Sequence, residues 1–428
     1  MLPLLVTIFV AAYAAIALEH PIRINKTASA LIAAGLLWTV YALMGGNHEL
    51  IDENLSESLS STAQIVFFLM GAMTIVEVVD AHNGFDVITS RIHTTRQSSL
   101  MWLVGVVTFF LSAMLDNLTT TIVMISLMRK LIDNHEDRLF FAGMIVVAAN
   151  AGGAWSPIGD VTTTMLWIGG HITTLAIMKS VLIPSAVNLI APLLVTSYLL
   201  RGKVVTPPAA DHAHQGVTTS EFEKKLMFFM GIGCLVAVPV FKTVTHLPPF
   251  MGILFGLGIL WLVGELLHRD KQEEEKEPLT LVHALTHIDM GSIIFFIGIL
   301  LSVATLEHTH ILSALAGWFD QTVGRTGLIV MIIGLISAII DNVPLVAASM
   351  GMYDLAAYPP DSFLWEFLAY CAGTGGSILI IGSAAGVAAM GLEKIHFFWY
   401  AKRIGGLALI GYGAGALAYI AQYQLLNG

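Results

Sequence analysis

Three aspartates interrupt long apolar stretches of this 428-residue chain. Asp116 and Asp341 lie at the centres of two such stretches, and each is followed by an asparagine, Asn117 or Asn342. Asp160 follows Ser-Pro-Ile-Gly in a third stretch. An ionisable group inside a bilayer costs about 3 kcal/mol on insertion scales, so it marks a functional site by default. Carboxylate and carbonyl oxygens suit a small alkali cation or a proton, and the sequence therefore predicts one polar pocket deep in the membrane.

Amide and hydroxyl side chains near the aspartates complete the expected pocket. The candidate ion- and proton-binding residues are Asp116, Asn117, Thr119, Asn150, Asp160, Thr163, Ser337, Asp341, Asn342, Ser377 and Ser383. Asp116 and Asp341 also have a structural alternative, because aspartate caps helices and turns. The serines have one too, because small residues allow close helix packing. No cofactor is expected.

The aspartates belong to an internal repeat. The matched segments are 112–117 (Ser-Ala-Met-Leu-Asp-Asn) with 337–342 (Ser-Ala-Ile-Ile-Asp-Asn), Gly152-Gly153 with Gly375-Gly376, and Ile158-Gly159 with Ile381-Gly382. The offset between partners is nearly constant, which is hard to obtain by chance. The repeat is not symmetric in charge, because the partner of Asp160 is Ser383.

Two kinds of interrupted element must position these residues. The apolar runs 98–128 and 326–353 exceed the ~20 residues of one span and carry a central aspartate, which predicts re-entrant hairpins. The runs 139–169 and 364–391 are broken by Gly, Ser or Pro, which predicts transmembrane helices with an unwound centre. Irregular backbone at that depth persists only where protein or a watery cavity satisfies it.

The chain divides into two membrane halves in this interpretation. Residues 1–200 form the first repeat, 201–225 a cytoplasmic linker, and 226–428 the second repeat. Each half holds an odd number of full spans besides its hairpin, so the second half enters the membrane inverted. The predicted fold class is an all-α polytopic membrane protein with two inverted-topology repeats, each with a re-entrant helical hairpin and a broken transmembrane helix. Secondary transporters have this architecture.

Composition and charge placement support a membrane protein. Hydrophobic types make up 56% of the residues and charged types only 12%, against ~25% charged in soluble domains. This excludes an ordinary cytosolic enzyme and a nucleic-acid binder, and no P-loop or HExxH motif is present. The alternation of spans places all but three of the 20 Lys and Arg residues on one face, which the positive-inside rule makes cytoplasmic. The other face receives an acidic loop at 46–61.

These motifs resemble the ion transporter superfamily, which includes citrate and dicarboxylate carriers and arsenite pumps. The chain is most similar to its bacterial NhaD-type sodium/proton antiporters, with the sharpest resemblance at 112–121, 150–164, 337–344 and 373–386. Carboxylate-transporting relatives carry Ser-Asn-Thr at the hairpin tips, where this chain has Asp-Asn. Carboxylates at the site repel a dianion, so the departure argues against an anionic substrate.

The resemblance implies exchange of Na+ or Li+ for H+ across a bacterial inner membrane by a homodimer with a scaffold and a moving transport domain. Na+ is then expected at the predicted cluster, led by Asp116, Asp160 and Asp341. The ionised aspartates bind the cation, and protonation displaces it. Such coupling requires that the two states differ in ligand affinity. An anion or arsenite permease of the same superfamily is the alternative function, and an intramembrane aspartyl protease is a third, suggested by Gly159-Asp160.

Overall fold

Seven helices are long and apolar enough to cross a membrane among residues 1–89, 94, 96–205 and 219–427, the part of the chain that the computed structural model describes. They are Lys26–Met44, His48–Ala81, Thr174–Leu199, Glu221–Thr245, Pro249–Leu267, Met290–His308 and Phe397–Leu426. The described residues contain helices and turns without a strand, which confirms the all-α class. Most of the predicted linker, residues 206–218, lies outside the described residues.

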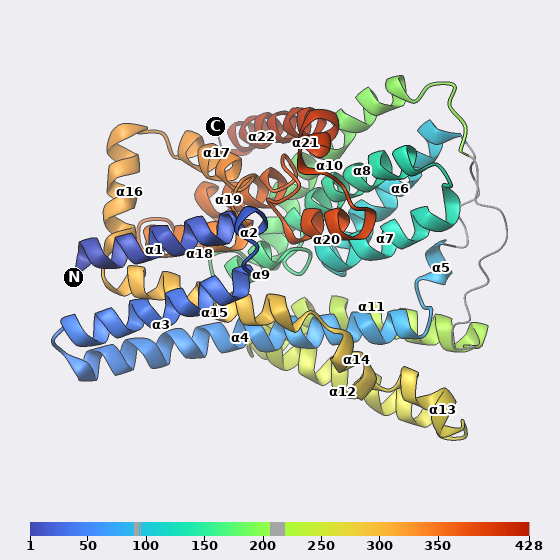
Figure 1. The fold of residues 1–428 in the computed structure, drawn as a ribbon, viewed down its shortest axis with the longest axis horizontal. Helices are drawn as coiled ribbons and strands as arrows, with labels where there is room; N and C mark the ends of the chain where they lie inside the picture. Colours follow the sequence, from blue (N-terminus) through green and yellow to red (C-terminus); the bar gives the residue numbers. More distant parts are fainter. Residues whose placement is uncertain (90–93, 95, 206–218, 428) are drawn as a thin grey trace.

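One group of long helices, here called the packing layer, lies along the lower part of Figure 1. It consists of α1 (Leu2–Ala17), α3 (Lys26–Met44), α4 (His48–Ala81), α11 (Glu221–Thr245), α12 (Pro249–Leu267) and α15 (Met290–His308). Helix α3 packs against α1 and α15, and α4 packs against α11, α12 and α15. Glycines allow close approach here, since Gly298 lies against the backbone of Ala30 and Gly231 against Val79.

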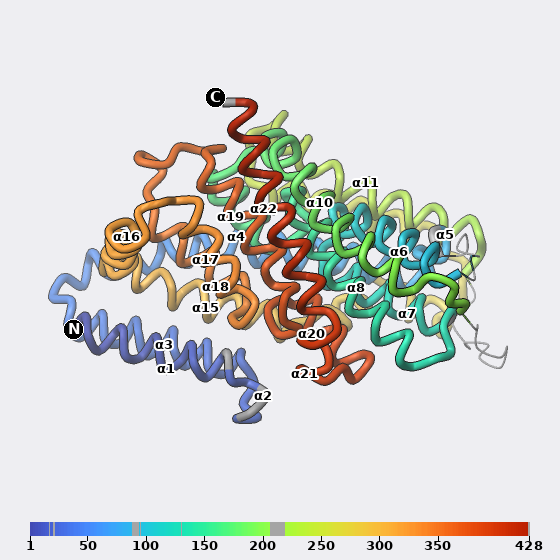
Figure 2. The backbone as a smooth tube through the Cα atoms, turned by 90° about the horizontal axis from the view of Figure 1, so that it is seen from above, coloured from blue at the N-terminus to red at the C-terminus, as the bar shows by residue number. Residues whose placement is uncertain are grey.

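A second group, here called the hairpin layer, holds all the interrupted elements. Its helices are α6 (Gln97–Ser112), α7 (Asn117–Leu131), α8 (His135–Ala154), α9 (Val161–Ile168), α10 (Thr174–Leu199), α17 (Thr326–Ile336), α18 (Asn342–Met352), α19 (Phe363–Gly375), α20 (Ala384–Glu393) and α22 (Gly406–Asn427). Elements of the two repeats interleave, because α20 packs against α7 and α8 while α10 runs along α22. Figure 2 shows α22 beside α10 and α19.

The interrupted elements are confirmed. The run 98–128 is a hairpin of α6 and α7 that turns at 113–116, and the run 326–353 is a hairpin of α17 and α18 that turns at 337–341. The runs 139–169 and 364–391 are helices broken at 155–160 and 376–383. Each half therefore supplies one hairpin and one broken helix, as the inverted-repeat architecture requires.

Two features of the helices differ from the sequence expectation. The acidic loop expected at 46–61 is wrong, because α4 begins at His48 and is 34 residues long. Glu49, Asp52, Glu53 and Glu57 recur at helical spacing, and a charged face is compatible with a helix that continues into solvent. The amphipathic helix α16 (Ile311–Thr322), which meets α17 at a bend of 118°, was not anticipated.

Short elements connect the long helices. They are α2 (Glu19–Ile22), α5 (Asp86–Thr89), α13 (Glu273–Lys276), a 3₁₀ turn (Glu277–Leu279), α14 (Leu281–His287), α21 (Phe397–Tyr400) and a π-helical turn (Ala401–Gly405). The π-helical turn leads directly into α22 (Figure 1).

Candidate ion-binding site

The four half-helices that follow the breaks each begin with a polar cap. The caps of α7, α9, α18 and α20 are Asp116, Asp160, Asp341 and Ser383, which accept backbone N–H groups of Thr119, Thr162, Val343 and Gly386 at 2.7, 2.9, 3.2 and 3.2 Å. Capping, the structural alternative for these residues, is therefore present. It explains the charge asymmetry of the repeat, since aspartate and serine are both preferred caps.

A buried network of side chains joins the two repeats. The Asn117 amide donates to Asp160 Oδ2 at 2.7 Å and to Asn150 Oδ1 at 2.9 Å. The Asn150 amide donates to Ser377 Oγ at 2.9 Å and to Ser383 Oγ at 2.8 Å. These five residues, here called the central network, are all buried. They include candidates from the hairpin tip, from the first broken helix and from the second.

Asp160 is the acid of the central network and is 2% exposed. Its Oδ1 accepts both the backbone N–H and the hydroxyl of Thr162, at 2.9 and 2.8 Å. The predicted ligand Thr163 lies elsewhere, because its hydroxyl donates to the main-chain carbonyl of Asp160 at 2.9 Å. Thr162 takes the place beside the carboxylate. A cap side chain accepts from the second or the third residue after it, so the capping pattern marks both threonines and does not choose between them.

Asp116 is held by Thr119, another predicted site residue. The backbone N–H of Thr119 donates to Oδ1 at 2.7 Å and its hydroxyl donates to Oδ2 at 2.8 Å. Asp116 has φ 147° and ψ 164°, a conformation that residues with a side chain rarely adopt. Such strain costs about 1–3 kcal/mol and persists only where surrounding contacts enforce it, as it does at functional sites.

Asp341 has a different partner from the other two acids. Its Oδ2 lies 2.8 Å from the Lys26 ammonium, and its Oδ1 accepts the N–H of Val343. Lys26 was expected only as a flanking basic residue. Asp160 lies within electrostatic range of both Asp341 and Asp116. Asn342 is buried, and its amide nitrogen has no hydrogen-bond partner among the described residues.

The same backbone bracing recurs in both repeats. Ser112 donates to the carbonyl of Ala149 at 2.6 Å, and Ser337 donates to that of Ala372 at 2.9 Å. The predicted ligand Ser337 thus ties the second hairpin to its broken helix. A Cβ at Gly152 would collide with the carbonyl of Phe109, and one at Gly375 would collide with that of Gly334. Both glycines are required for this close approach of hairpin and broken helix.

This arrangement has the chemistry of a cation site. Each break ends one helix, whose last carbonyls are partly negative, and begins another at an oxygen-bearing cap. Carboxylate, amide and hydroxyl oxygens from both repeats meet there in a buried setting. A small cation or a proton on a carboxylate is the group that such a site neutralises.

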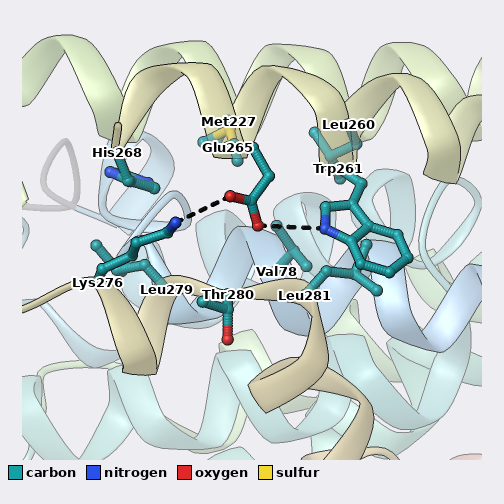
Figure 3. A pocket seen from close by; sticks show the side chains of 11 residues that line it. Val78, Met227, Leu260, Trp261, Glu265, His268, Lys276, Leu279, Thr280 and Leu281 are labelled. Carbon is teal, nitrogen blue, oxygen red and sulfur yellow. Dashed lines mark hydrogen bonds and ion pairs between the residues drawn. The ribbon is translucent and has the colours of Figure 1, made fainter. Parts of the chain in front are cut away.

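A separate small pocket lies at the end of α12, away from the predicted site (Figure 3). Its volume is about 10 Å³, which is room for about one water molecule. Glu265 pairs there with Lys276 at 3.0 Å and accepts a hydrogen bond from the Trp261 indole N–H at 3.4 Å. The residues that line this pocket include none of the candidate ion ligands.

The geometry defines a multi-pass helical membrane protein with secondary-transporter architecture, and comparisons with known proteins agree. Residues 13–373 match the citrate transporter family, CitMHS. The chain is 50% identical to sodium/proton antiporter 1 of Arabidopsis thaliana over 96% of its length, and it covers 71% of that protein. It is 28% identical to the Na(+)/H(+) antiporter NhaD of Halomonas elongata, covering 97% of this chain and 87% of that one.

A solved structure supports the fold. The YdaH transporter of Alcanivorax borkumensis, described as having an unusual topology, superposes with a TM-score of 0.63 over 93% of this chain and 98% of its own, at 11% identity. The chain therefore belongs to the citrate transporter family, and its resemblance to NhaD-type sodium/proton antiporters is confirmed.

Proposed function

We propose that this protein is a secondary active transporter that exchanges Na+ or Li+ for H+. Asp160 carries the proposal, because its buried carboxylate sits in a hydrogen-bonded network built by both repeats. Asp116 and Asp341 are its charged neighbours. The antiporter names of relatives from plants and bacteria support the same activity.

The mechanism is competition for the same oxygens. A cation bound at Asp160 replaces the amide hydrogen bond of Asn117 with an ionic contact, while Asn150, Ser377 and Ser383 supply further oxygens. A proton on the carboxylate removes the charge that holds the cation. Moving an ionised, empty site past apolar surroundings is costly, so the pocket crosses only when it is loaded or protonated. This requirement couples the two fluxes.

The alternative is an anion permease, which the citrate transporter name of the family favours. The carboxylate of Asp160, in electrostatic range of both Asp116 and Asp341, opposes an anionic substrate, because one lysine neutralises only Asp341. A dianion at this site would face uncompensated like charge.

Exchange in proteoliposomes tests the proposal. Purified protein is reconstituted with an imposed pH gradient, and the gradient is followed with a fluorescent probe after addition of Na+, Li+, K+, choline or citrate at several pH values. We expect Na+ or Li+ to dissipate the gradient. In everted vesicles, Asp341→Asn abolishes this dissipation while the protein stays in the membrane. Citrate uptake without cation-stimulated proton movement would overturn the proposal in favour of the permease.

The membrane location, the oligomeric state and the partners of the protein are also part of the proposal. We propose that the protein lies in a bacterial inner membrane, and the concentration of Lys and Arg on one predicted face supports an orientation with that face in the cytoplasm. We also propose a homodimer, with small cations and protons as substrates, the bilayer as its environment, and no enzymatic activity or nucleic-acid partner. Cross-linking in native membranes tests the dimer, and a monomer-only result would contradict it.

A further inference from the structure

The positively charged side chain of Lys26 pairs with one of the three site acids, Asp341. Its ammonium lies 2.8 Å from Asp341 Oδ2, and the two side chains are 20% and 10% exposed. The ammonium also lies over the Phe295 ring, 4.4 Å from its centroid. Glu19 accepts the backbone N–H of Lys26 at 3.1 Å. The lysine is therefore held at Asp341 from several directions.

The other two acids have no such partner among the described residues. Asp116 accepts only neutral donors from Thr119, and Asp160 accepts only neutral donors from Thr162 and Asn117. An ammonium is a monovalent cation that binds carboxylate oxygens by charge-assisted contacts. Lys26 thus occupies, at one acid, the position that a transported monovalent cation would take.

The pair also joins the two layers of the molecule. Lys26 is the first residue of α3, which packs on α1 and α15 of the packing layer. Asp341 caps α18 of the hairpin layer. A change in the charge of Asp341 therefore changes an attraction between the layers.

We propose that the Lys26 ammonium is a built-in competitor for the transported cation at Asp341, and that a cation bound there displaces it and releases the contact between α3 and α18. This inference rests on the proposed cation/proton exchange and assigns Lys26 a role in its affinity. When no cation is bound, Lys26 neutralises Asp341, so at most two of the three carboxylates are uncompensated. The cost is a weaker apparent affinity for the substrate cation, because the lysine must first be displaced.

Lys242 offers a matched control within the same chain. It lies on α11 of the packing layer, and its ammonium donates to the Trp167 carbonyl on α9 at 2.7 Å. It lies over the Trp167 ring at 4.4 Å from the centroid, the same distance as between Lys26 and Phe295. Lys242 therefore also bridges the layers, but it contacts no carboxylate among the described residues. Replacing it removes a bridging lysine without changing the competition at Asp341.

The test measures the half-saturating Na+ concentration for exchange in proteoliposomes. We expect Lys26→Met to lower it about tenfold, because the competing charge is gone. Lys26→Arg keeps the charge and stays near wild type, and Lys242→Met leaves half-saturation unchanged. A merely structural role for Lys26 predicts reduced protein or rate with unchanged half-saturation. Unchanged or weaker Na+ affinity in Lys26→Met overturns the inference while wild-type exchange keeps the proposed function, and absent wild-type exchange overturns the function itself.

A measurement on the wild-type protein covers the case in which Lys26→Met does not fold. Reductive methylation of lysines in detergent-purified protein is quantified by mass spectrometry with Na+ or with choline at equal ionic strength. We expect Na+ to raise methylation of Lys26 severalfold and to leave Lys242 unchanged, because displacement frees only the ammonium at Asp341. Equal methylation of Lys26 in both salts contradicts the competition.

Discussion

In the first hairpin the tip aspartate, Asp116, bonds to its own helix through Thr119 and has a strained φ of 147°. In the second hairpin the tip aspartate, Asp341, has an ordinary φ of −45° and reaches out of its own layer to Lys26. The backbone around both tips is nevertheless braced by the same serine-to-carbonyl hydrogen bond. Duplication has preserved how hairpin and broken helix pack and has kept an aspartate at each tip, while the partners of the two aspartates have diverged.

The broken helices differ in the same way. Both hold a glycine against the hairpin backbone, Gly152 in one and Gly375 in the other. One half-helix begins at the carboxylate of Asp160 and the other at the hydroxyl of Ser383. Packing positions can therefore be expected to respond equally to substitution in the two repeats, and charged positions unequally.

The largest expected effect is at Asp160, whose counterpart in the second repeat is Ser383. Asp160→Asn should reduce Na+-dependent exchange at least about a hundredfold, equivalent to about 3 kcal/mol, because the central charge is lost. Asparagine is as good a cap as aspartate, so α9 and the melting temperature in detergent should be retained. Asp289→Asn, the same change at the cap of α15 outside the site, is the matched control and should keep wild-type exchange. Wild-type exchange in Asp160→Asn would remove this carboxylate from the mechanism.

Gly152 and Gly375 test whether hairpin and broken helix pack equivalently in the two repeats. Gly152→Ala and Gly375→Ala each push a methyl group into a backbone carbonyl that has no room to move. Overpacking of this kind costs about 3 kcal/mol, so both variants should lose several degrees of melting temperature to a similar extent. Gly35→Ala is the control, since no atom lies within 4 Å of its added Cβ. A large loss of melting temperature in only one of the two variants would contradict equivalent packing in the two repeats.

Two histidines that each follow a long helix, His82 and His310, differ in burial. His82 follows α4, is fully buried, and places its Nε2 2.7 Å from Nε2 of His268. His310 follows α15 and is exposed. Burial lowers the pKa of His82, and burial together with the charges of His82 and Lys271 lowers the pKa of His268 to about 4. Glu223, which lies 3.7 Å from His268 Nδ1 and pairs with Lys271, opposes that lowering only in part.

The sign of the pH effect follows from proton binding. Between pH 6.5 and about 4 the unfolded chain binds a proton at His268 that the folded chain does not, and the lowered pKa of His82 acts in the same direction, so stability falls as the pH falls. We expect the melting temperature in detergent to decrease over that range and to decrease less steeply in His268→Gln. His310→Gln should follow the wild-type curve. Parallel curves for wild type and His268→Gln would show that the pair does not govern acid stability.

The smallest expected effect is at the bracing serines. Ser112→Ala and Ser337→Ala each remove one hydroxyl-to-carbonyl bond, worth about 1 kcal/mol. The two losses of stability should agree, measured as thermal unfolding in detergent. A change in Na+ affinity in Ser337→Ala alone would support the predicted role of Ser337 as a ligand.

The interrupted elements were predictable from sequence because helix breakers and acids within apolar runs are costly and seldom accidental. The pairing of Asn117 with Asp160 follows from that placement. The choice of Thr162 over Thr163 depends on the start of α9 to within one residue, which apolar patterning does not fix.

Other features depend on tertiary placement. The contact of Lys26 with Asp341 joins positions 315 residues apart and is decided by where α3 lies beside the second hairpin. Near the start of α4, the cluster of acidic residues predicts a loop, whereas these residues recur at helical spacing along a helix. The stacked pair of His82 and His268 is likewise a meeting of two helix ends that no local pattern marks.

The caps of the half-helices make ion binding detectable at backbone amides. The oxygens proposed to hold a cation are also the oxygens that secure the first turns of α7, α9 and α18 through Thr119, Thr162 and Val343. A cation on these carboxylate oxygens competes for their lone pairs and weakens the hydrogen bonds that they accept from the three amides. Deuterium uptake at the three amides would then report, residue by residue, which acid the ion has engaged.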